Sequence, residues 1–303
     1  MIPYTVRFLL IVTLVFSYSW SVAQDEEEDS KPRPARKAYE GAWLIDNQTD
    51  IINTKGTLEM IIQHRFGTVD NGASDLWGIY APGNIRIGFT YSLLERLSLG
   101  VGFAKVNVSN PVIDGNAKFK ILQQTRGNEI PVNVTYYGNF AVDTRSEDNF
   151  KNSTGRLSYF HELIVSRRFS SKVSFQVGGV FSHFNAVDSL YSNDVYGITA
   201  GGRFKLTPQT SIMLEWTEPL VEHEINTVAD ESLRRDAGPN RNISIGAEIA
   251  TSAHSFQVFF TTYRDNLPQY NLHYNTNAWS KEIDGENKLN FLVGFNITRL
   301  WGF

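Results

Sequence analysis

The feature that most constrains this chain is an alternation of apolar residues with polar or small ones, which recurs in nearly every segment from residue 56 onward. Leu97, Leu99, Val101 and Phe103, for example, alternate with serine, glycine and alanine. This is the period of a β-strand with two unlike faces. The pattern predicts an all-β protein.

We predict about twelve strands in this part of the chain. Many are close to the ~9–11 residues that a tilted strand needs to cross a bilayer. Their ranges are 58–63, 85–91, 97–104, 116–124, 131–142, 157–168, 172–184, 195–205, 211–218, 241–250, 255–264 and 288–303.

The connections between these strands alternate strictly between long and short, as an up-and-down barrel in an outer membrane requires. An open sheet edge in hydrocarbon would leave unpaired backbone groups, so the sheet has to close. We therefore predict a closed, up-and-down, antiparallel transmembrane β-barrel of about 12 strands with both termini periplasmic. A soluble all-β domain stays open as an alternative, because such strands occur in both settings. The long connections are 67–83, 107–115, 143–156, 185–194, 219–240 and 265–287, and the short ones are 92–96, 125–130, 169–171, 206–210 and 251–254.

The N-terminal residues predict export and a tether. Residues 1–23 have the pattern of a secretory signal peptide, with Arg7, an apolar run over residues 8–16 and small residues up to Ala23. Residues 24–45 are expected to form a disordered, charged periplasmic tether, because an acidic block beside a proline-broken basic block has little apolar surface to bury. The basic half could alternatively contact phosphates or another envelope protein. Residues 46–303 are assigned to the outer-membrane barrel.

Composition excludes several classes of function. The chain has no cysteine, which excludes lipoprotein anchoring, thiolate metal sites, cysteine nucleophiles and disulfides. Loss of Arg7 with the signal peptide leaves 27 basic and 32 acidic residues, a net charge of −5, which argues against nucleic acid as a partner. No nucleotide motif or plug domain is visible, and no cofactor or metal is expected.

The C-terminal Phe303 follows the last predicted strand. A terminal aromatic residue in this position resembles the signal by which Gram-negative outer-membrane barrels are recognised for insertion. It implies contact with outer-membrane lipid and with the barrel-assembly machinery during insertion.

Several segments carry a family resemblance. They are residues 54–58, 64–67 (His-Arg-Phe-Gly), 75–78, 84–88, 97–102, 118–123 and 131–135. Together they resemble a family of predicted outer-membrane β-barrels of unknown function, over about residues 46–303. The resemblance implies the barrel and supplies no activity.

Charged residues of both signs occupy the inward positions of the predicted strands. Charges in a narrow lumen must be paired or hydrated, so either a salt-bridged plug or a wet channel would account for them. Inward glycines, such as Gly102 and Gly201, either widen the lumen or let the strands bend. The lumen-facing candidates are Glu59, Arg86, Lys118, Lys120, Glu162, Arg203, Glu215 and Glu248. In strand 157–168 this assignment turns His161 toward lipid.

Other candidates lie at the predicted rim. His64 and Arg65 end the first strand and could form a ligand or partner site, or Arg65 could simply pair with a carboxylate. Tyr270, His273, Tyr274 and Trp279 lie in one long loop, where they could contact a partner protein or sugar, or fold inward and cap the lumen. The acidic loop 218–231 could hold a divalent cation, although such loops are usually just solvated.

These patterns favour a passive channel for small solutes with a constricted lumen of mixed charge. The main alternative is a structural or interaction barrel whose lumen is closed and whose outer loops or tether bind another protein. An outer-membrane hydrolase is a third hypothesis. It would use His183 with Asp188 or His254 with Ser255, but neither pair comes with a complete catalytic set, so we predict no enzyme activity.

Overall fold

The computed structural model describes residues 32–106, 110–189, 191–221, 239–283 and 285–303. One compact unit, Arg33–Phe303, contains all the strands. Among the described residues, no helix combines the length and the apolar character that would let it cross a bilayer.

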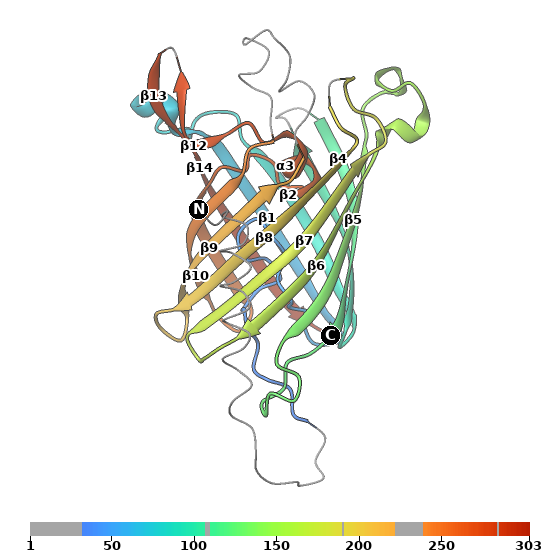
Figure 1. The fold of residues 1–303 in the computed structure, drawn as a ribbon, viewed down its shortest axis with the longest axis vertical. Coiled ribbons are helices and arrows are strands. Elements are labelled where there is room, and N and C mark those ends of the chain that lie inside the picture. The colour runs from blue at the N-terminus through green and yellow to red at the C-terminus, as the bar shows by residue number, and fades with distance from the viewer. Residues whose placement is uncertain (1–31, 107–109, 190, 222–238, 284) are drawn as a thin grey trace, which may run out of the picture. The chain divides into compact units, whose positions relative to one another are not determined.

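Twelve strands form a closed antiparallel barrel (Figure 1). Each strand pairs with its neighbour in the sequence, and β14 closes the sheet against β1, for example through Ile62 opposite Ile297. The predicted closed barrel of about twelve strands is therefore confirmed. The strands are β1 (Thr57–Thr68), β2 (Asn84–Leu94), β3 (Leu97–Val106), β4 (Asn110–Leu122), β5 (Asn133–Asp143), β6 (Leu157–Arg168), β7 (Val173–Phe184), β8 (Asp194–Lys205), β9 (Thr210–Pro219), β10 (Asn242–Ala250), β11 (His254–Thr261) and β14 (Leu292–Gly302).

The two faces of the sheet carry opposite chemistry. Along β6, Glu162 and Ser166 are buried inside the barrel, whereas Leu163 is 48% exposed on the outside. His161 also faces outward, as predicted, and its Nδ1 lies 2.6 Å from the Tyr136 hydroxyl. An apolar exterior around a polar interior is the arrangement of a barrel whose solvent is lipid.

Some strand ends differ from the sequence prediction. Residues 107–115 were predicted to be a long connection, which is wrong, because β4 already begins at Asn110. Pro111 and Gly115 suggest a turn, but pairing of Ile113 with Phe103 on one side and Val142 on the other overrides that local preference. The strict alternation of connection lengths fails at this point.

The loop after β11 also has structure of its own. It contains the helix α3 (Pro268–Tyr274) and a separate hairpin of β12 (Ala278–Ile283) and β13 (Glu286–Asn290). The last barrel strand thus begins at Leu292 rather than at the predicted residue 288. Three short 3-10 helices lie in other loops: η1 (Val69–Asp75), η2 (Glu147–Asn149) and η3 (Ser153–Arg156).

Residues 33–37 lie at the end of the barrel that carries the short turns, at the bottom of Figure 1, and lead into its interior. Pro34 forms a β-bridge with Thr125 in the β4–β5 turn, and Phe303 bonds to Gly56 at the same end. Residues 38–53, here called the luminal segment, then lie inside the barrel and are mostly buried. The prediction of a disordered tether is wrong for residues 33–45, because this stretch includes apolar residues that pack in the lumen. Residues 24–31 lie outside the described residues.

The outward face generates a prediction. Val101, in the middle of β3, is 50% exposed on the apolar exterior. We expect Val101→Lys to lower the free energy of unfolding in lipid bilayers by about 2–4 kcal/mol, because the charge would lie in hydrocarbon. Urea titration in vesicles would measure this, with Val101→Ile as control. An unchanged unfolding midpoint for the lysine variant would contradict a membrane-embedded β3.

Candidate functional site: the filled lumen

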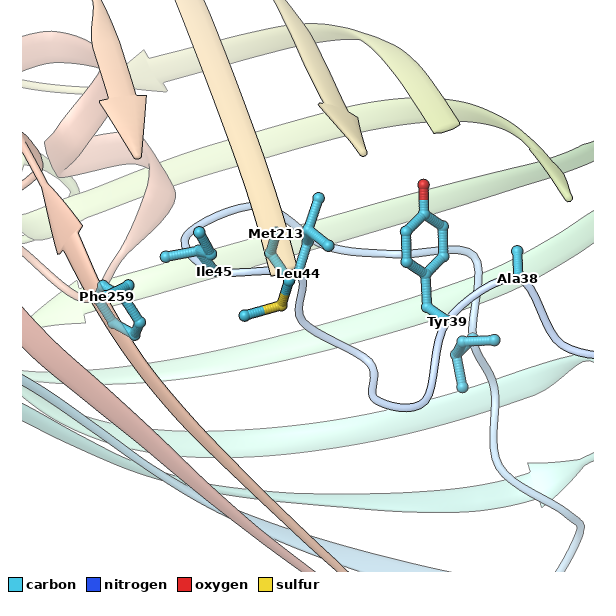
Figure 2. Packing of buried hydrophobic residues seen from close by; sticks show 7 residues of the cluster. Ala38, Tyr39, Leu44, Ile45, Met213 and Phe259 are labelled. Carbon is cyan, nitrogen blue, oxygen red and sulfur yellow. The ribbon is translucent and has the colours of Figure 1, made fainter. Parts of the chain in front are cut away.

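The luminal segment folds back on itself inside the barrel. Leu44 N–H donates to Asn47 O at 3.0 Å, and Thr49 N–H donates to Ala42 O at 2.8 Å, which closes a tight turn. Several of its apolar side chains pack in one cluster with two wall residues, as Figure 2 shows, while Leu44 also lies against Gly201 of β8 and Trp43 packs against Tyr137 of β5. The cluster comprises Ala38, Tyr39, Leu44, Ile45, Ile51 and, from the wall, Met213 and Phe259.

The deepest ion pair joins the luminal segment to β1. Arg65 donates to Asp46 Oδ1 from Nε at 3.2 Å and from Nη2 at 2.8 Å, and both side chains are 1% exposed. Arg65 also donates to Asn296 and lies over the Phe259 ring at 4.4 Å. The other Asp46 oxygen accepts from Ser244 and Thr261 at 2.8 and 2.7 Å. Asp46 is therefore fully compensated by the wall.

Glu215 on β9 holds the backbone of the same turn. Its carboxylate accepts the N–H groups of Ile45, Asp46 and Asn47 at 2.9, 2.8 and 3.1 Å. Three main-chain donors converging on one carboxylate fix both the position and the direction of the turn.

Two lysines of β4 hold the far side of the segment. Lys118 Nζ donates to three carbonyl oxygens, those of Ala42, Thr49 and Ile51, at 3.0–3.2 Å. Lys120 Nζ lies 3.3 Å from Asp50 Oδ2. The ammonium of Lys118 thus relies on main-chain oxygens that only the folded luminal segment supplies.

Amide side chains of the wall complete the attachment. Gln176, Gln257 and Asn296 each donate to a backbone carbonyl of the segment, at 2.7, 3.1 and 2.9 Å. Asn53 of the segment donates to Glu59 on β1 at 2.8 Å. Every one of these contacts is polar.

The entrance of the segment is held by Glu40. Arg203 and Lys205 on β8 both donate to its Oε1, at 3.0 and 2.7 Å. Burial alone would raise the pKa of Glu40, but the hydrogen bonds and charges of Lys205 and Arg203 outweigh it and lower that pKa. Glu40 is therefore ionised at neutral pH.

Three predicted luminal residues bond to the wall itself. Arg86 forms a bidentate pair with Asp114, at 2.8 and 2.7 Å. Glu162 accepts from Thr199, and Glu248 accepts from Ser255 and Gln257. With the five described above, all eight predicted lumen-facing residues are buried in the interior. Their role in conduction stays a prediction.

The helix α3 covers the opposite end of the lumen. His273 Nδ1 lies 2.7 Å from Ser182 Oγ, and Gln269 donates to Asn139 at 2.9 Å. The ring of Tyr270 packs edge-on against Phe184, and burial raises the pKa of the Tyr270 phenol. Tyr270 and His273 therefore cap the lumen, which is the second of the two arrangements predicted for this loop. Tyr274 is partly buried and packs on the apolar cluster that contains Phe184 and Tyr270.

The remaining rim candidates do not form one site. Arg65 faces the lumen, whereas His64 faces outward and stacks on Phe295 at 5.2 Å. A shared ligand site at these two residues is therefore wrong, and the carboxylate pairing predicted for Arg65 is confirmed. Trp279 packs on Phe291 outside the barrel, with its Nε1 donating to Ile243 O at 3.0 Å.

The hydrolase pairs are not assembled. His183 bonds to Asp194 rather than Asp188. Ser255 points inward to Glu248, while its neighbour His254 contacts Arg299.

In the described part of the chain no three His, Asp or Glu residues cluster as metal ligands. Most of the acidic loop 218–231 lies outside the described residues, so a cation there stays a prediction.

Little space is left inside. A cavity of about 20 Å³ lies between the luminal segment and the wall near Glu59 and Lys118. Another of about 10 Å³ lies between Asp46 and α3. Since a single water needs about 10–15 Å³, these spaces admit no larger solute.

Sequence reasoning missed the residues that fill the lumen. Asp46, Asp50 and Asn53 were not singled out, and Asp114 fell in a predicted loop. A signal was present, because residues 38–52 contain Tyr39 and many other apolar residues that a disordered tether would not need.

Comparisons with known proteins agree with the fold. A family model described as "Membrane bound beta barrel domain (DUF5777)" matches residues 39–301. No curated protein has a significant sequence match.

Similar solved structures include two porins and one outer membrane channel. The NanC porin has 6% identity and a TM-score of 0.49, covering 80% of this chain and 99% of its own. The COG4313 outer membrane channel from Pseudomonas putida F1 has 14% identity and a TM-score of 0.49, with 83% and 97% coverage. The KdgM porin in complex with disordered oligogalacturonate has 6% identity and a TM-score of 0.48, with 80% and 98% coverage.

The Arg65–Asp46 pair generates a second prediction. We expect Arg65→Met to lower the protection of the luminal-segment amides by about 3–5 kcal/mol, because Asp46 would be left as an uncompensated buried charge. Hydrogen exchange of residues 38–53 in detergent micelles would measure it. Arg241→Met is the matched control, since Arg241 is 63% exposed and pairs with Glu218 near the surface, where a pair contributes about 0–1 kcal/mol. Equal protection in the two variants would show that the Arg65–Asp46 pair does not hold the luminal segment in place.

A third prediction concerns Gly102. A Cβ at this position would overlap Asp114 Oδ1 and Arg86 Nη2. We expect Gly102→Ala to destabilise the barrel by about 1–3 kcal/mol through overpacking. Gly179→Ala is the control, because nothing lies within 4 Å of its added Cβ. Urea unfolding would compare the two, and equal midpoints would show that Gly102 is not needed for the ion pair.

Proposed function

This chain belongs to the membrane bound beta barrel domain family, and we propose that it is an outer-membrane channel for small polar solutes. The luminal segment closes this channel in the described state. Transport is passive, and the channel opens when the segment leaves the lumen. The wall residues Arg86, Lys118, Glu162 and Glu215 then line a wet pore of mixed charge.

One observation carries this proposal: around the luminal segment the wall presents mostly charged and amide side chains, and the segment is held to it mainly by hydrogen bonds and ion pairs, with apolar contacts at Met213 and Phe259. A barrel interior that is permanently packed could be filled by apolar side chains, which avoid the cost of dehydrating charges. Here the wall keeps charged and amide groups whose partners water can replace. Such a wall can be hydrated in the open state, in which the luminal segment has left the lumen.

The orientation and export are part of the same proposal. The first 23 residues direct export, the barrel-assembly machinery inserts the chain, and both ends of the mature protein lie in the periplasm. In this orientation the segment enters from the periplasmic side and α3 lies at the outer surface.

The second candidate function is a closed barrel that binds another envelope protein. The cap formed by α3 favours it, because this helix adds a second obstruction to the one made by the luminal segment. The two candidates differ in whether removing the obstructions produces conduction.

Planar-bilayer recording tests the channel. We expect brief, rare openings of the wild-type protein and at least about tenfold more open time when residues 38–53 are deleted. The reason is that the deletion removes the segment that blocks the lumen. In the full chain its release breaks polar contacts worth about 0.5–1.5 kcal/mol each, or about 1.5–3 kcal/mol where one partner is charged, so openings stay rare. Deletion of residues 24–31 is the control. A further arm replaces Pro268–Tyr274 with a Gly-Ser linker in the deletion background.

A reversible lock sharpens this test, since the natural chain has no cysteine. A Cβ added at Gly201 would lie 2.5 Å from Leu44 Cδ2, so these two positions are neighbours across the lumen and are the pair at which to introduce cysteines. The oxidised Leu44→Cys/Gly201→Cys variant should lose the rare openings, and a reductant should restore them. If folded barrels without residues 38–53 and without the cap carry no current, the channel proposal is wrong and the closed barrel stands.

A further inference from the structure

An open cavity lies at the short-turn end of the barrel, and its charged residues take no part in the contacts of the luminal segment described above. Its volume is about 340 Å³. Three arginines line it: Arg36, which precedes the luminal segment, Arg126 in the β4–β5 turn and Arg168 at the end of β6. The other lining residues are Ala35, Gln124, Thr125, Ser170 and Ser171.

The backbone around these arginines is held in place. Ala35 N–H donates to Gln124 O at 2.8 Å, and Arg126 N–H donates to Arg33 O at 2.9 Å. Gln124 joins β6 to the same structure, since its amide donates to Arg168 O and its Oε1 accepts Arg168 N–H. These bonds hold the backbone segments that carry the three arginines side by side, although Arg36 and Arg126 themselves are exposed.

Only part of each guanidinium is engaged. Arg126 Nε donates to Pro34 O at 3.3 Å, and Arg168 Nε donates to Ser170 O at 2.9 Å. The terminal nitrogens of both side chains are left for another acceptor. Within the described ranges, no carboxylate lies in ion-pair distance of Arg36, Arg126 or Arg168.

Nearby acidic groups already have partners. Glu40 is bound by Arg203 and Lys205. Glu129, in the same turn as Arg126, accepts from Thr125 Oγ1. Ser170 Oγ accepts the N–H groups of Lys172 and Val173, so its own hydrogen can be donated. Among the described residues that line it, the cavity thus offers three positive charges and a hydroxyl donor and no carboxylate.

We propose that this cavity binds a soluble small molecule that carries two or more oxyanions, of the phosphate-ester or pyrophosphate class. Guanidinium groups bind phosphate oxygens in bidentate geometry. The volume is at the lower end of the ~300–1,000 Å³ typical of small-molecule sites. Arg168 continues the luminal row of β6 that includes Ser166, so the site opens to the mouth of the lumen rather than to the lipid face.

The site also includes a residue next to the segment that is proposed to close the channel. Arg36 belongs to the stem of the luminal segment, whereas Arg126 and Arg168 belong to the barrel. An anion that bridges them binds the closed state more tightly than a state in which the stem has left, so it favours closure. This coupling rests on the proposed function, whereas the binding itself does not.

Calorimetry on the full chain in detergent micelles at low salt, with inorganic pyrophosphate as the probe, tests the site. We expect saturable binding that is weakened at least about tenfold in the Arg126→Gln/Arg168→Gln variant. Arg96→Gln should change the affinity by less than about twofold. Arg96 is an exposed arginine of the β2–β3 turn that does not line the cavity. Gel mobility with and without boiling verifies that each variant is folded.

Several outcomes would overturn the proposal. They are an absence of saturable heat with the wild-type protein, equal weakening by Arg96→Gln, or binding of short-chain phosphatidylglycerol without binding of pyrophosphate. The last would assign the arginines to a lipid headgroup. A bilayer recording with pyrophosphate on the short-turn side then tests the coupling separately, with reduced open time expected.

Discussion

The constraint on which this structure depends is that every charge inside the barrel needs a partner where water is excluded. Arg65 has Asp46, and Glu215 has three main-chain N–H groups of the same turn. Lys118 has three carbonyl oxygens instead of a carboxylate. The wall and the luminal segment therefore complete each other, and neither is satisfied alone unless water enters.

The barrel could be predicted from the sequence because its determinants are local. Alternation along a strand, such as Leu97 to Phe103, separates a lipid face from a luminal face without any knowledge of the neighbours. Strand ends were harder to predict. Pro111 and Gly115 are turn residues by propensity, yet they lie in β4 because the two flanking strands are long enough to pair with them. Such pairing depends on residues that are distant in sequence.

The luminal segment was missed for a related reason. Charge composition led to the tether prediction, which the apolar residues between Ala38 and Ile52 contradict once their partners are known. Those partners are remote, since the carboxylate that binds Asp46 N–H is 169 residues away. The error at His64 and Arg65 was avoidable. Consecutive strand residues face opposite sides, so they could not have formed a single site.

The division of contacts indicates which part of the molecule can move. Leaving the lumen would cost the segment polar contacts that water replaces, worth about 0.5–1.5 kcal/mol net each, or about 1.5–3 kcal/mol where one partner is charged. Its apolar residues share a cluster with Met213 and Phe259 of the wall and would lose those contacts as well. Opening the wall would instead expose backbone N–H and C=O groups to lipid, where they have no substitute partner. A change of state in this protein is therefore expected to move the segment within a fixed cylinder of strands.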